Sequence, residues 1–373
     1  MTAFALLIFI GGCVIFLQWY IGIRRLPVIS NYPSDCLRDL PSVTVIVAVR
    51  DEEKNIYDSV YTLLNQNYCH LEIIVVNDRS TDHTLSLLNK LKASHINHDK
   101  LKIITISHLP AGWLGKNHAL YQGFLQSKGE ILLFTDGDIF FTKETLKRTV
   151  NYLISYNLDH LTLIPENKGG TLPYRAFHSY WSIIGIWNFI QLNHAGVGAF
   201  NMIRASVYRK IGTHESVALS PDDDLKLGKL IVSKGFRQQL GLGKDLVSVQ
   251  WYQNIPEVIH GLEKNLFAFM RYRVLYVVLF SIVIFLFHVI PFIGLFTASF
   301  FAQLTFAAVI SLYALMFTIN ARIFNDSSWF FLWVPINAFI FIFCLCRSAY
   351  KTIRNGGITW RGTRYPLKDL RKK

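Results

Sequence analysis

Long uncharged apolar stretches are the feature that most limits what this chain of 373 residues can fold into. Residues 3–23 carry no charge, and residues 274–297, 298–319 and 329–346 are also uncharged. A bilayer-spanning helix needs about 20 apolar residues, so the first three stretches are long enough and the last is marginal. The first stretch lacks a basic start and a small-residue cleavage site, and we interpret it as a retained anchor.

Basic residues follow these apolar stretches. Arg24 and Arg25 follow the first, and residues 347–373 hold nine Lys or Arg against one acid, Asp369. The net charge of +13 makes a nucleic-acid partner worth considering, but cations beside spans fit the positive-inside rule and contact with an anionic membrane surface. We therefore expect a multi-pass integral membrane protein and no nucleic-acid partner.

Between the apolar ends, the pattern alternates strands with helices. Buried strands are expected at 42–49, 71–76, 101–106 and 131–135, and helices at 54–66, 81–93, 117–127 and 142–157. Such alternation predicts an α/β fold with a mostly parallel sheet flanked by helices. The expected parts are an anchor (1–25), the α/β domain (30–260), an amphipathic interface helix (261–273), membrane segments (274–348) and a basic tail (349–373).

Residues 173–193 are rich in aromatic side chains, with only Arg175 and His178 able to carry charge. A core helix explains this composition. A helix in the membrane interface explains it equally well, because Trp and Tyr are enriched there. Both interpretations stay open.

The expected strand at 131–135 leads directly into Asp136-Gly137-Asp138. Ligands of open α/β sheets bind beyond the carboxyl ends of the strands, which is where these two acids would lie. Carboxylates this close repel each other unless a cation lies beside them, and Mg²⁺ or Mn²⁺ held partly by phosphate and water suits that need. The alternative is an acidic turn, because Asp-Gly is a common turn pair.

Acids also follow two other strands, as Asp51 with Glu52 and as Asp78. Acids at three ends of one parallel sheet indicate a single site, whereas structural acids would more often be scattered helix caps. Farther along, Ser220-Pro221 precedes three consecutive acids, 222–224, at the start of an amphipathic helix. These acids could stabilise the helix dipole, or one could act as a general base.

Taken together, these motifs resemble the inverting glycosyltransferases of family 2, which have a GT-A fold. Four features carry the resemblance in the family's order, namely Val49–Glu53, Val75–Asp82, Asp136-Gly137-Asp138, and Asp223-Asp224 with Leu227-Gly228. The stretch Gly112–Ala119 further resembles a branch that glycosylates membrane lipids of the carotenoid, hopanoid and ceramide types.

The resemblance implies roles for particular residues. Glu52 and Asp78 would contact the uridine of a UDP-sugar, Lys116 would approach the nucleotide or its pyrophosphate, and Asp136 would face the nucleotide-sugar. Asp138 would bind Mg²⁺ or Mn²⁺. Asp224 would be the general base, with Asp223 as its neighbour.

The function implied is transfer of a single sugar from a UDP-sugar to a hydroxyl of a membrane lipid, by a hexosyltransferase with a cytosolic catalytic domain. The family often has Gln-x-x-Arg-Trp before its C-terminal spans. Here Glu263–Phe267 contains no Trp, which speaks against a processive polysaccharide synthase. Transfer to a polyprenyl phosphate is a second possible function, and a non-catalytic membrane scaffold or transporter subunit is a third.

A cytosolic catalytic domain raises a problem of topology. Three full spans after it would place the basic tail outside, against the positive-inside rule. Either one C-terminal segment is re-entrant or interfacial, or the tail breaks the rule. Residues 329–346, which contain Pro335 and Asn337, are the first candidate for a segment that does not span.

Overall fold

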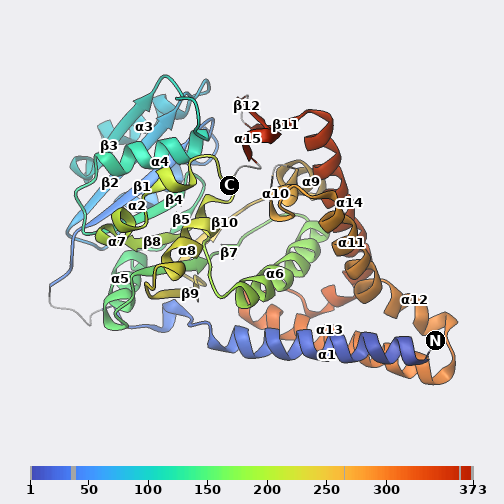
Figure 1. The fold of residues 1–373 in the computed structure, drawn as a ribbon. Helices are drawn as coiled ribbons and strands as arrows, with labels where there is room; N and C mark the ends of the chain where they lie inside the picture. The colour runs from blue at the N-terminus through green and yellow to red at the C-terminus, as the bar shows by residue number, and fades with distance from the viewer. Residues whose placement is uncertain (1, 35–38, 264, 361–362, 371–373) are drawn as a thin grey trace. The chain divides into compact units, whose positions relative to one another are not determined.

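The computed structural model describes residues 2–34, 39–263, 265–360 and 363–370 (Figure 1). Contacts divide the chain into two compact units. The helical unit comprises Met1–Arg25, Gly169–Asn193 and Trp251–Lys373, and the sheet unit comprises Leu26–Lys168 and His194–Gln250. This grouping differs from the expected domain at 30–260 by placing 169–193 and 251–260 with the terminal helices.

The sheet unit is built on a seven-stranded sheet of order β3-β2-β1-β4-β8-β6-β9. Its strands are β1 (Val43–Val49), β2 (Leu71–Asp78), β3 (Leu101–Ile106), β4 (Ile131–Asp136), β6 (His160–Ile164), β8 (Asn201–Arg204) and β9 (Gln238–Leu242). Strands β1 to β4 are mutually parallel, and β8 runs antiparallel to both β4 and β6. The expected mixed, mostly parallel sheet is confirmed. A small second sheet joins β5 (Phe140–Phe141), β10 (Val247–Val249) and β7 (Glu166–Asn167).

The four expected strands form because they are rich in apolar, β-branched residues. The sheet buries β1, β2 and β4 on both faces, whereas the edge strand β3 is buried only at its two ends. The helices between them are α2 (Ile56–Leu64), α3 (Thr84–Ser94) and α4 (Gly115–Leu125), with α5 (Thr145–Ser155) after β4. Each expected strand and helix of this region is present, with ends shifted by a few residues.

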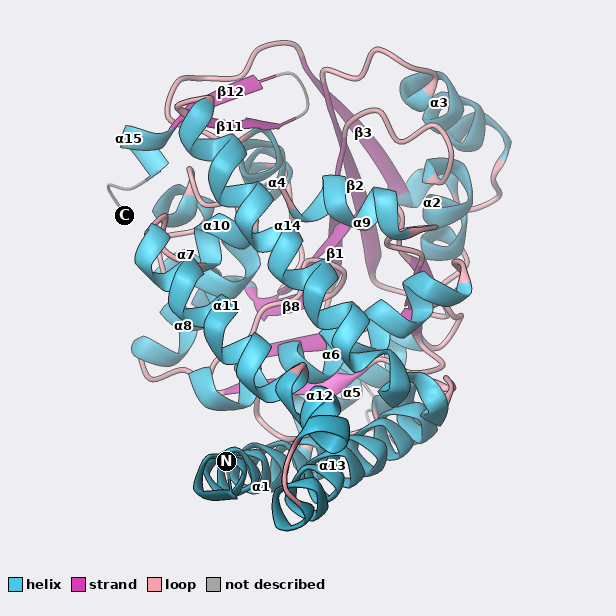
Figure 2. Cartoon of the chain, turned by 90° about the vertical axis from the view of Figure 1, so that its right-hand side faces the viewer, coloured by secondary structure: helices cyan, strands magenta, loops and turns pink. Residues whose placement is uncertain are grey.

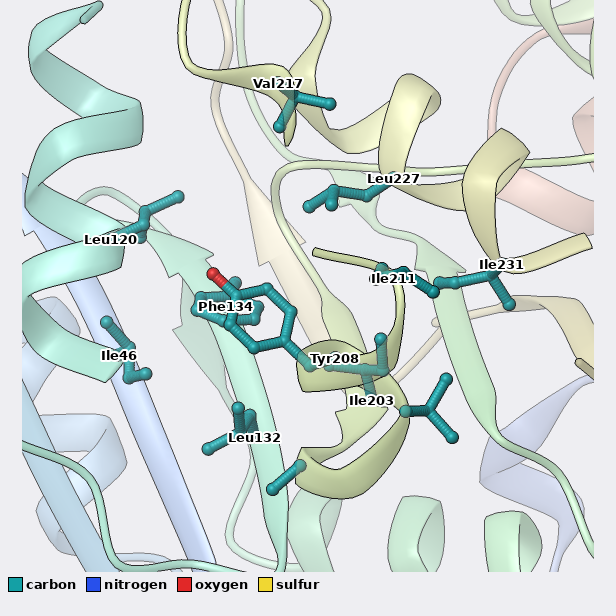
Figure 3. Packing of buried hydrophobic residues seen from close by; sticks show 12 residues of the cluster. Ile46, Leu120, Leu132, Phe134, Ile203, Tyr208, Ile211, Val217, Leu227 and Ile231 are labelled. Carbon is teal, nitrogen blue, oxygen red and sulfur yellow. The ribbon is translucent and has the colours of Figure 1, made fainter. Parts of the chain in front are cut away.

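One core cluster determines where the later helices lie against the sheet (Figure 3). Ile46 of β1 and Leu132 and Phe134 of β4 pack with Tyr208 of α7 (Ala205–Lys210) and with Leu227 of α8 (Asp223–Ser233). This packing holds the first turn of α8, which carries the acids 223 and 224, over the carboxyl end of β4.

The helical unit contains α1 (Thr2–Arg25), α6 (Leu172–Leu192), α9 (Ile255–Leu262), α10 (Leu266–Phe269), α11 (Val274–His288), α12 (Ile290–Thr297), α13 (Phe300–Phe324) and α14 (Val334–Arg354). Helices α1 and α13 lie side by side (Figure 2). The hydroxyl oxygens of Thr2 and Ser299 are 3.5 Å apart, and Gly12 faces Leu312, so the two helices run in the same direction.

Polar side chains connect α6 to these helices. Trp187 donates to Gln18 of α1 (3.1 Å), and Arg175 pairs with Asp326 after α13 (2.8 Å). Asn320 of α13 donates to the hydroxyl of Ser179 (3.1 Å). Helix α6, whose sequence allowed two interpretations, therefore packs among the apolar helices.

Three helices are long and apolar enough to cross a membrane, at Thr2–Arg25, Phe300–Phe324 and Ser328–Arg354. Residues 274–297 form a fourth candidate only as the pair α11 and α12, bent by 42°. The break precedes Pro291, which has no N–H to continue the hydrogen bonding of α11.

Two other expected segments have more structure than a single helix or tail. Residues 261–273 are divided between the end of α9 and α10, after which Arg271 and Tyr272 have positive φ; Lys264 lies outside the described residues. The expected tail contains a hairpin, β11 (Gly357–Trp360) and β12 (Thr363–Pro366), followed by α15 (Leu367–Leu370). Its residues 361–362 and 371–373 lie outside the described part.

Candidate active site

Lys116 and Asp136 form the central ion pair of the sheet unit. Lys116 is the second residue of α4, and Asp136 is the last residue of β4. The Lys116 Nζ lies 2.6 Å from Asp136 Oδ1, and their side chains are 21% and 36% exposed. Both charges are therefore within reach of solvent or of a bound molecule at the carboxyl end of the sheet.

A glycine-containing loop, residues 194–200, crosses directly over this ion pair. A Cβ on Gly198 would lie 3.0 Å from Asp136 Oδ2, 3.1 Å from Lys116 Nζ and 3.5 Å from Asp224 Oδ2. A Cβ on Gly196 would lie 1.9 Å from the carbonyl oxygen of Asp224, so only glycine fits there. Three candidate residues from separate elements thus converge on one point.

Asn117, next to Lys116, fixes the segment that leads into α8. Its side-chain amide donates to the backbone oxygens of Val217, Ala218 and Ser220 at 2.9, 3.2 and 3.0 Å. Helix α4 therefore presents Lys116 on one side and holds the approach to the acids of α8 on the other.

The acids of α8 occupy its first turn. Asp223 is buried, and Asp224 is half-buried and accepts a hydrogen bond from the backbone N–H of Leu225 (2.8 Å). Asp222 is the N-cap residue but makes no side-chain capping bond. Capping by Asp222 therefore does not explain the run of three acids.

Lys116, Asp223 and Asp224 differ in the direction in which their surroundings shift their pKa values. Burial alone lowers the pKa of an ammonium group, but the carboxylates of Asp136, Asp223 and Asp224 outweigh it and raise the pKa of Lys116. Burial and then the charge on Asp223 raise the pKa of Asp224 to about 7. Burial also raises the pKa of Asp223, but Lys116 and then His214 outweigh it, so this pKa is lowered.

The ends of β1 and β2 are tied together next to this group. The backbone N–H of Glu52 donates to Thr84 Oγ1 (2.8 Å), and Asp51 Oδ1 accepts from the N–H of Thr81 (2.7 Å). Asp51 therefore organises the loop after β2, while Glu52 remains half-buried nearby.

Asp78 is the last residue of β2 and is buried. Both of its carboxylate oxygens accept from Arg79, at 2.7 and 2.9 Å. Its charge is thus partly neutralised within the chain. Nucleoside contacts at Glu52 and Asp78 stay predictions.

A divalent cation fits the acids around Asp138. Burial, then the charges of Asp136 and Glu52, raise the pKa of Asp138 to about 7, so negative charge is concentrated where a cation would relieve it. In the described part of the chain, no three His, Cys, Asp or Glu side chains gather into a complete metal site. The arrangement suits an ion that takes its remaining ligands from phosphate and water, as Mg²⁺ does.

The sheet unit also contains residues that sequence reasoning missed. His214, Asn117 and Arg79 all contact the candidate acids or the segments that hold them. Arg79 and Asn117 lie within the stretches Val75–Asp82 and Gly112–Ala119 but were given no role there, and His214 lies in neither of these stretches. The small residues of the loop 194–200 let it pass close to the side chains of Asp136 and Lys116.

Three comparisons relate this chain to known proteins. It is 22% identical to the 4,4'-diaponeurosporenoate glycosyltransferase of Staphylococcus aureus over 87% of this chain and 88% of the relative. It is 28% identical to the probable glycosyltransferase YdaM of Bacillus subtilis over 51% of this chain, which corresponds to about half (47%) of that relative's length.

A solved structure shares the fold. The mannosyltransferase PcManGT of Pyrobaculum calidifontis, in complex with GDP-Man and Mn²⁺, superposes with a TM-score of 0.56 at 17% identity, covering 95% of this chain and 99% of that one. The fold and the comparisons together define a glycosyltransferase with a GT-A fold. Residues 44–212 match the model for Glycosyl transferase family 2.

Proposed function

We propose that this enzyme transfers one sugar from a UDP-sugar to a hydroxyl group of a membrane lipid, with inversion at the anomeric carbon. The observation that carries the proposal is the convergence of Asp136, Lys116 and Asp224 around Gly198. Lys116 and Asp136 lie there in positions that suit binding of the donor. Beside them lies Asp224, whose carboxylate has a raised pKa and can accept a proton.

In the reaction, the acceptor oxygen forms a bond to the anomeric carbon while the bond from that carbon to the diphosphate breaks. Asp224 takes the proton of the acceptor hydroxyl, and the nucleoside diphosphate leaves with the electron pair. Lys116 offsets negative charge on the diphosphate as a point charge. Inversion follows from a single in-line displacement.

The residues around Asp138 would hold Mg²⁺ or Mn²⁺. When bound, the ion supplies Lewis-acid stabilisation of the leaving diphosphate. Glu52 and Asp78 would bind the nucleoside, since carboxylates accept hydrogen bonds from ribose hydroxyls and base N–H groups.

A lipid acceptor is supported by two observations. The Staphylococcus aureus relative, matched along most of its length, is named for a carotenoid-type acceptor. The helical unit also exposes large apolar side chains along whole helix faces, for example Ile336, Phe339 and Phe343 of α14. Such faces are stable in contact with lipid rather than water.

For the membrane arrangement, three crossings fit the contacts best, formed by α1, by α11 with α12, and by α13. The Thr2–Ser299 contact puts the turn before α13 beside the start of α1. Helix α13 then returns to the side of Arg24 and Arg25. With α14 in the interface, the basic tail stays on the catalytic, cytosolic side, in agreement with the positive-inside rule.

In the test, purified protein in extracted membrane lipid is incubated with labelled UDP-glucose, UDP-GlcNAc or GDP-mannose. The labelled lipid product is then identified by mass spectrometry. The expected product is a neutral lipid bearing one sugar, made from a UDP-sugar. Label on a polyprenyl phosphate or on a polymer would instead support that class of acceptor, and transfer from GDP-mannose alone would refute the UDP-sugar assignment.

The arrangement of the tail is tested separately. A protease-cleavable tag after Lys373 should be cut in inverted membrane vesicles and protected in intact spheroplasts. The opposite pattern would mean that α14 also crosses the membrane.

A further inference from the structure

A chain of three buried side chains lies behind the acid pair of α8. Tyr208 of α7, His214 of the 3₁₀ turn His214–Val217 and Asp223 are 0%, 1% and 4% exposed. Tyr208 Oη is 2.5 Å from His214 Nδ1, and His214 Nε2 is 3.5 Å from Asp223 Oδ2. The ring of Phe134 packs edge-on against His214, with centroids 4.9 Å apart, and limits its rotation.

The hydrogen bonds determine where the imidazole proton lies. The backbone N–H of His214 donates to Tyr208 Oη (2.9 Å), so this oxygen already accepts a hydrogen bond. We assign the Tyr208 O–H as the donor to Nδ1, which places the ring proton on Nε2. Nε2 is buried and makes no hydrogen bond of normal length to any described residue, and it faces Asp223 Oδ2 at 3.5 Å. The bond at Nδ1 thus fixes which nitrogen presents its proton to that carboxylate.

The consequence appears at the next residue. A donor directed at Asp223 favours its charged form, and a charged Asp223 disfavours charge on Asp224. Two adjacent carboxyl groups are thereby given different proton affinities, the usual way in which one acid of a pair becomes the proton acceptor.

We propose that His214, held by Tyr208, is a positioning residue that keeps the negative charge on Asp223 and so leaves proton exchange to Asp224. This proposal rests on the proposed function in one respect, the role of Asp224 as base. Other titratable or charged groups also face the chain and are unchanged in the tests: Lys116 and Tyr121 on α4, Asp136 on β4, Glu215 beside His214, and Asp224 itself.

The test compares His214→Gln with His214→Leu. Both variants lack a titrating imidazole, but only glutamine keeps an acceptor for Tyr208 and a donor for Asp223. In His214→Leu, the acid pair should bind its first proton more readily. The acidic limb of the profile of kcat/KM against pH should then move up by roughly half to one pH unit, the scale of one lost N–H group facing a carboxylate that belongs to a coupled pair.

Near pH 9 both carboxylates are ionised in every variant, so rates should converge there. His214→Gln should keep the wild-type limb. A purely structural role predicts the opposite, an equal loss of rate at every pH. If the acidic limbs of the pH profiles of His214→Gln and His214→Leu coincide, the proposal is overturned. The sugar donor in these assays is the nucleotide-sugar that the wild-type enzyme uses in the test of the proposed function.

A second measurement needs no substrate. Because the pKa of Asp223 is lowered in the folded state, its contribution to stability is present above the unfolded value and is lost as pH falls. The difference in melting temperature between the Gln and Leu variants should therefore be larger at pH 7 than near pH 2.5, which lies well below the unfolded value of about 3.9. An equal difference at both pH values would also overturn the proposal.

Two controls separate the possible failures. His160→Gln alters another buried histidine, bonded to Asn201 and Gln238, and should lower stability without moving the acidic limb. Asp224→Asn tests the base itself. Normal turnover in Asp224→Asn refutes the base assignment, whereas an inactive Asp224→Asn with an unshifted His214→Leu limb refutes only the role of His214.

Discussion

The Nζ of Lys116 lies 2.6 Å from Oδ1 of Asp136, at the junction of the first turn of α4 with the end of β4. Lys116 is the cation whose pKa three carboxylates of the site raise together, those of Asp136, Asp223 and Asp224. A cation in this position makes it possible for the acids of β4 and α8 to remain charged close together.

Lys116→Met removes that cation. The KM for the nucleotide-sugar should rise about tenfold to a hundredfold, the usual cost of one lost charge-assisted contact, while Lys116→Arg should lose less. The melting temperature of Lys116→Met should fall most near pH 8, where the carboxylates are ionised, and least near pH 4. Unchanged donor KM in both variants would contradict the assignment.

Asp138→Asn should abolish transfer, and chelation by EDTA should silence the wild type until Mg²⁺ or Mn²⁺ is restored. The measurement is sugar transfer at saturating donor, with melting temperature as the check on folding. Asp58→Asn, an exposed acid on α2, is the matched control and should keep full activity. Full wild-type activity in excess EDTA would contradict a metal role.

Asp224→Asn keeps shape and removes basicity, so single-turnover transfer should fall by roughly 10²–10⁴-fold with little change in donor affinity. Since the pKa of Asp224 is raised to about 7, wild-type kcat/KM should decline as pH falls through 7, where the base becomes protonated. If the acid were only structural, the variant would lose melting temperature and keep its turnover per folded molecule.

Gly198→Ala introduces a methyl group 3.0 Å from Asp136 Oδ2 and 3.1 Å from Lys116 Nζ, so the ion pair must shift. Turnover should fall by about 10²-fold, as for a displacement of about 1 Å in a reacting site. Gly185→Ala in α6 is the control, because nothing lies within 4 Å of its new methyl. Equal kinetics for the two variants would show that the loop does not constrain the site.

The sequence predicted most of the sheet unit because its strands are apolar and its acids fall at strand ends. Asp136 and Asp138 therefore lie at the end of β4, as expected, and Asp224 lies in the first turn of the expected helix, although their roles remain predictions. His214 could not be predicted, since its partners Tyr208 and Asp223 are brought to it by packing rather than by a motif.

Two features of the fold were also beyond the sequence pattern. Strand β8 is too short for its direction or its place between β4 and β6 to be read from alternation. The bend between α11 and α12 lies inside a mostly apolar stretch, where His288 and Pro291 are the residues beside the discontinuity.

The amide of Asn117 has a consequence for building hybrids of this enzyme with its relatives. Asn117 donates hydrogen bonds to the backbone at 217–220, and its neighbour Lys116 pairs with Asp136. The first turn of α4 therefore contacts both the end of β4 and the segment that leads into α8. In a chimera that takes only the segment 213–233 from a relative, the new segment would meet Asn117 of this chain instead of the residue that it contacts in the relative. A hybrid should therefore keep its activity only when residues 112–125 are exchanged together with that segment.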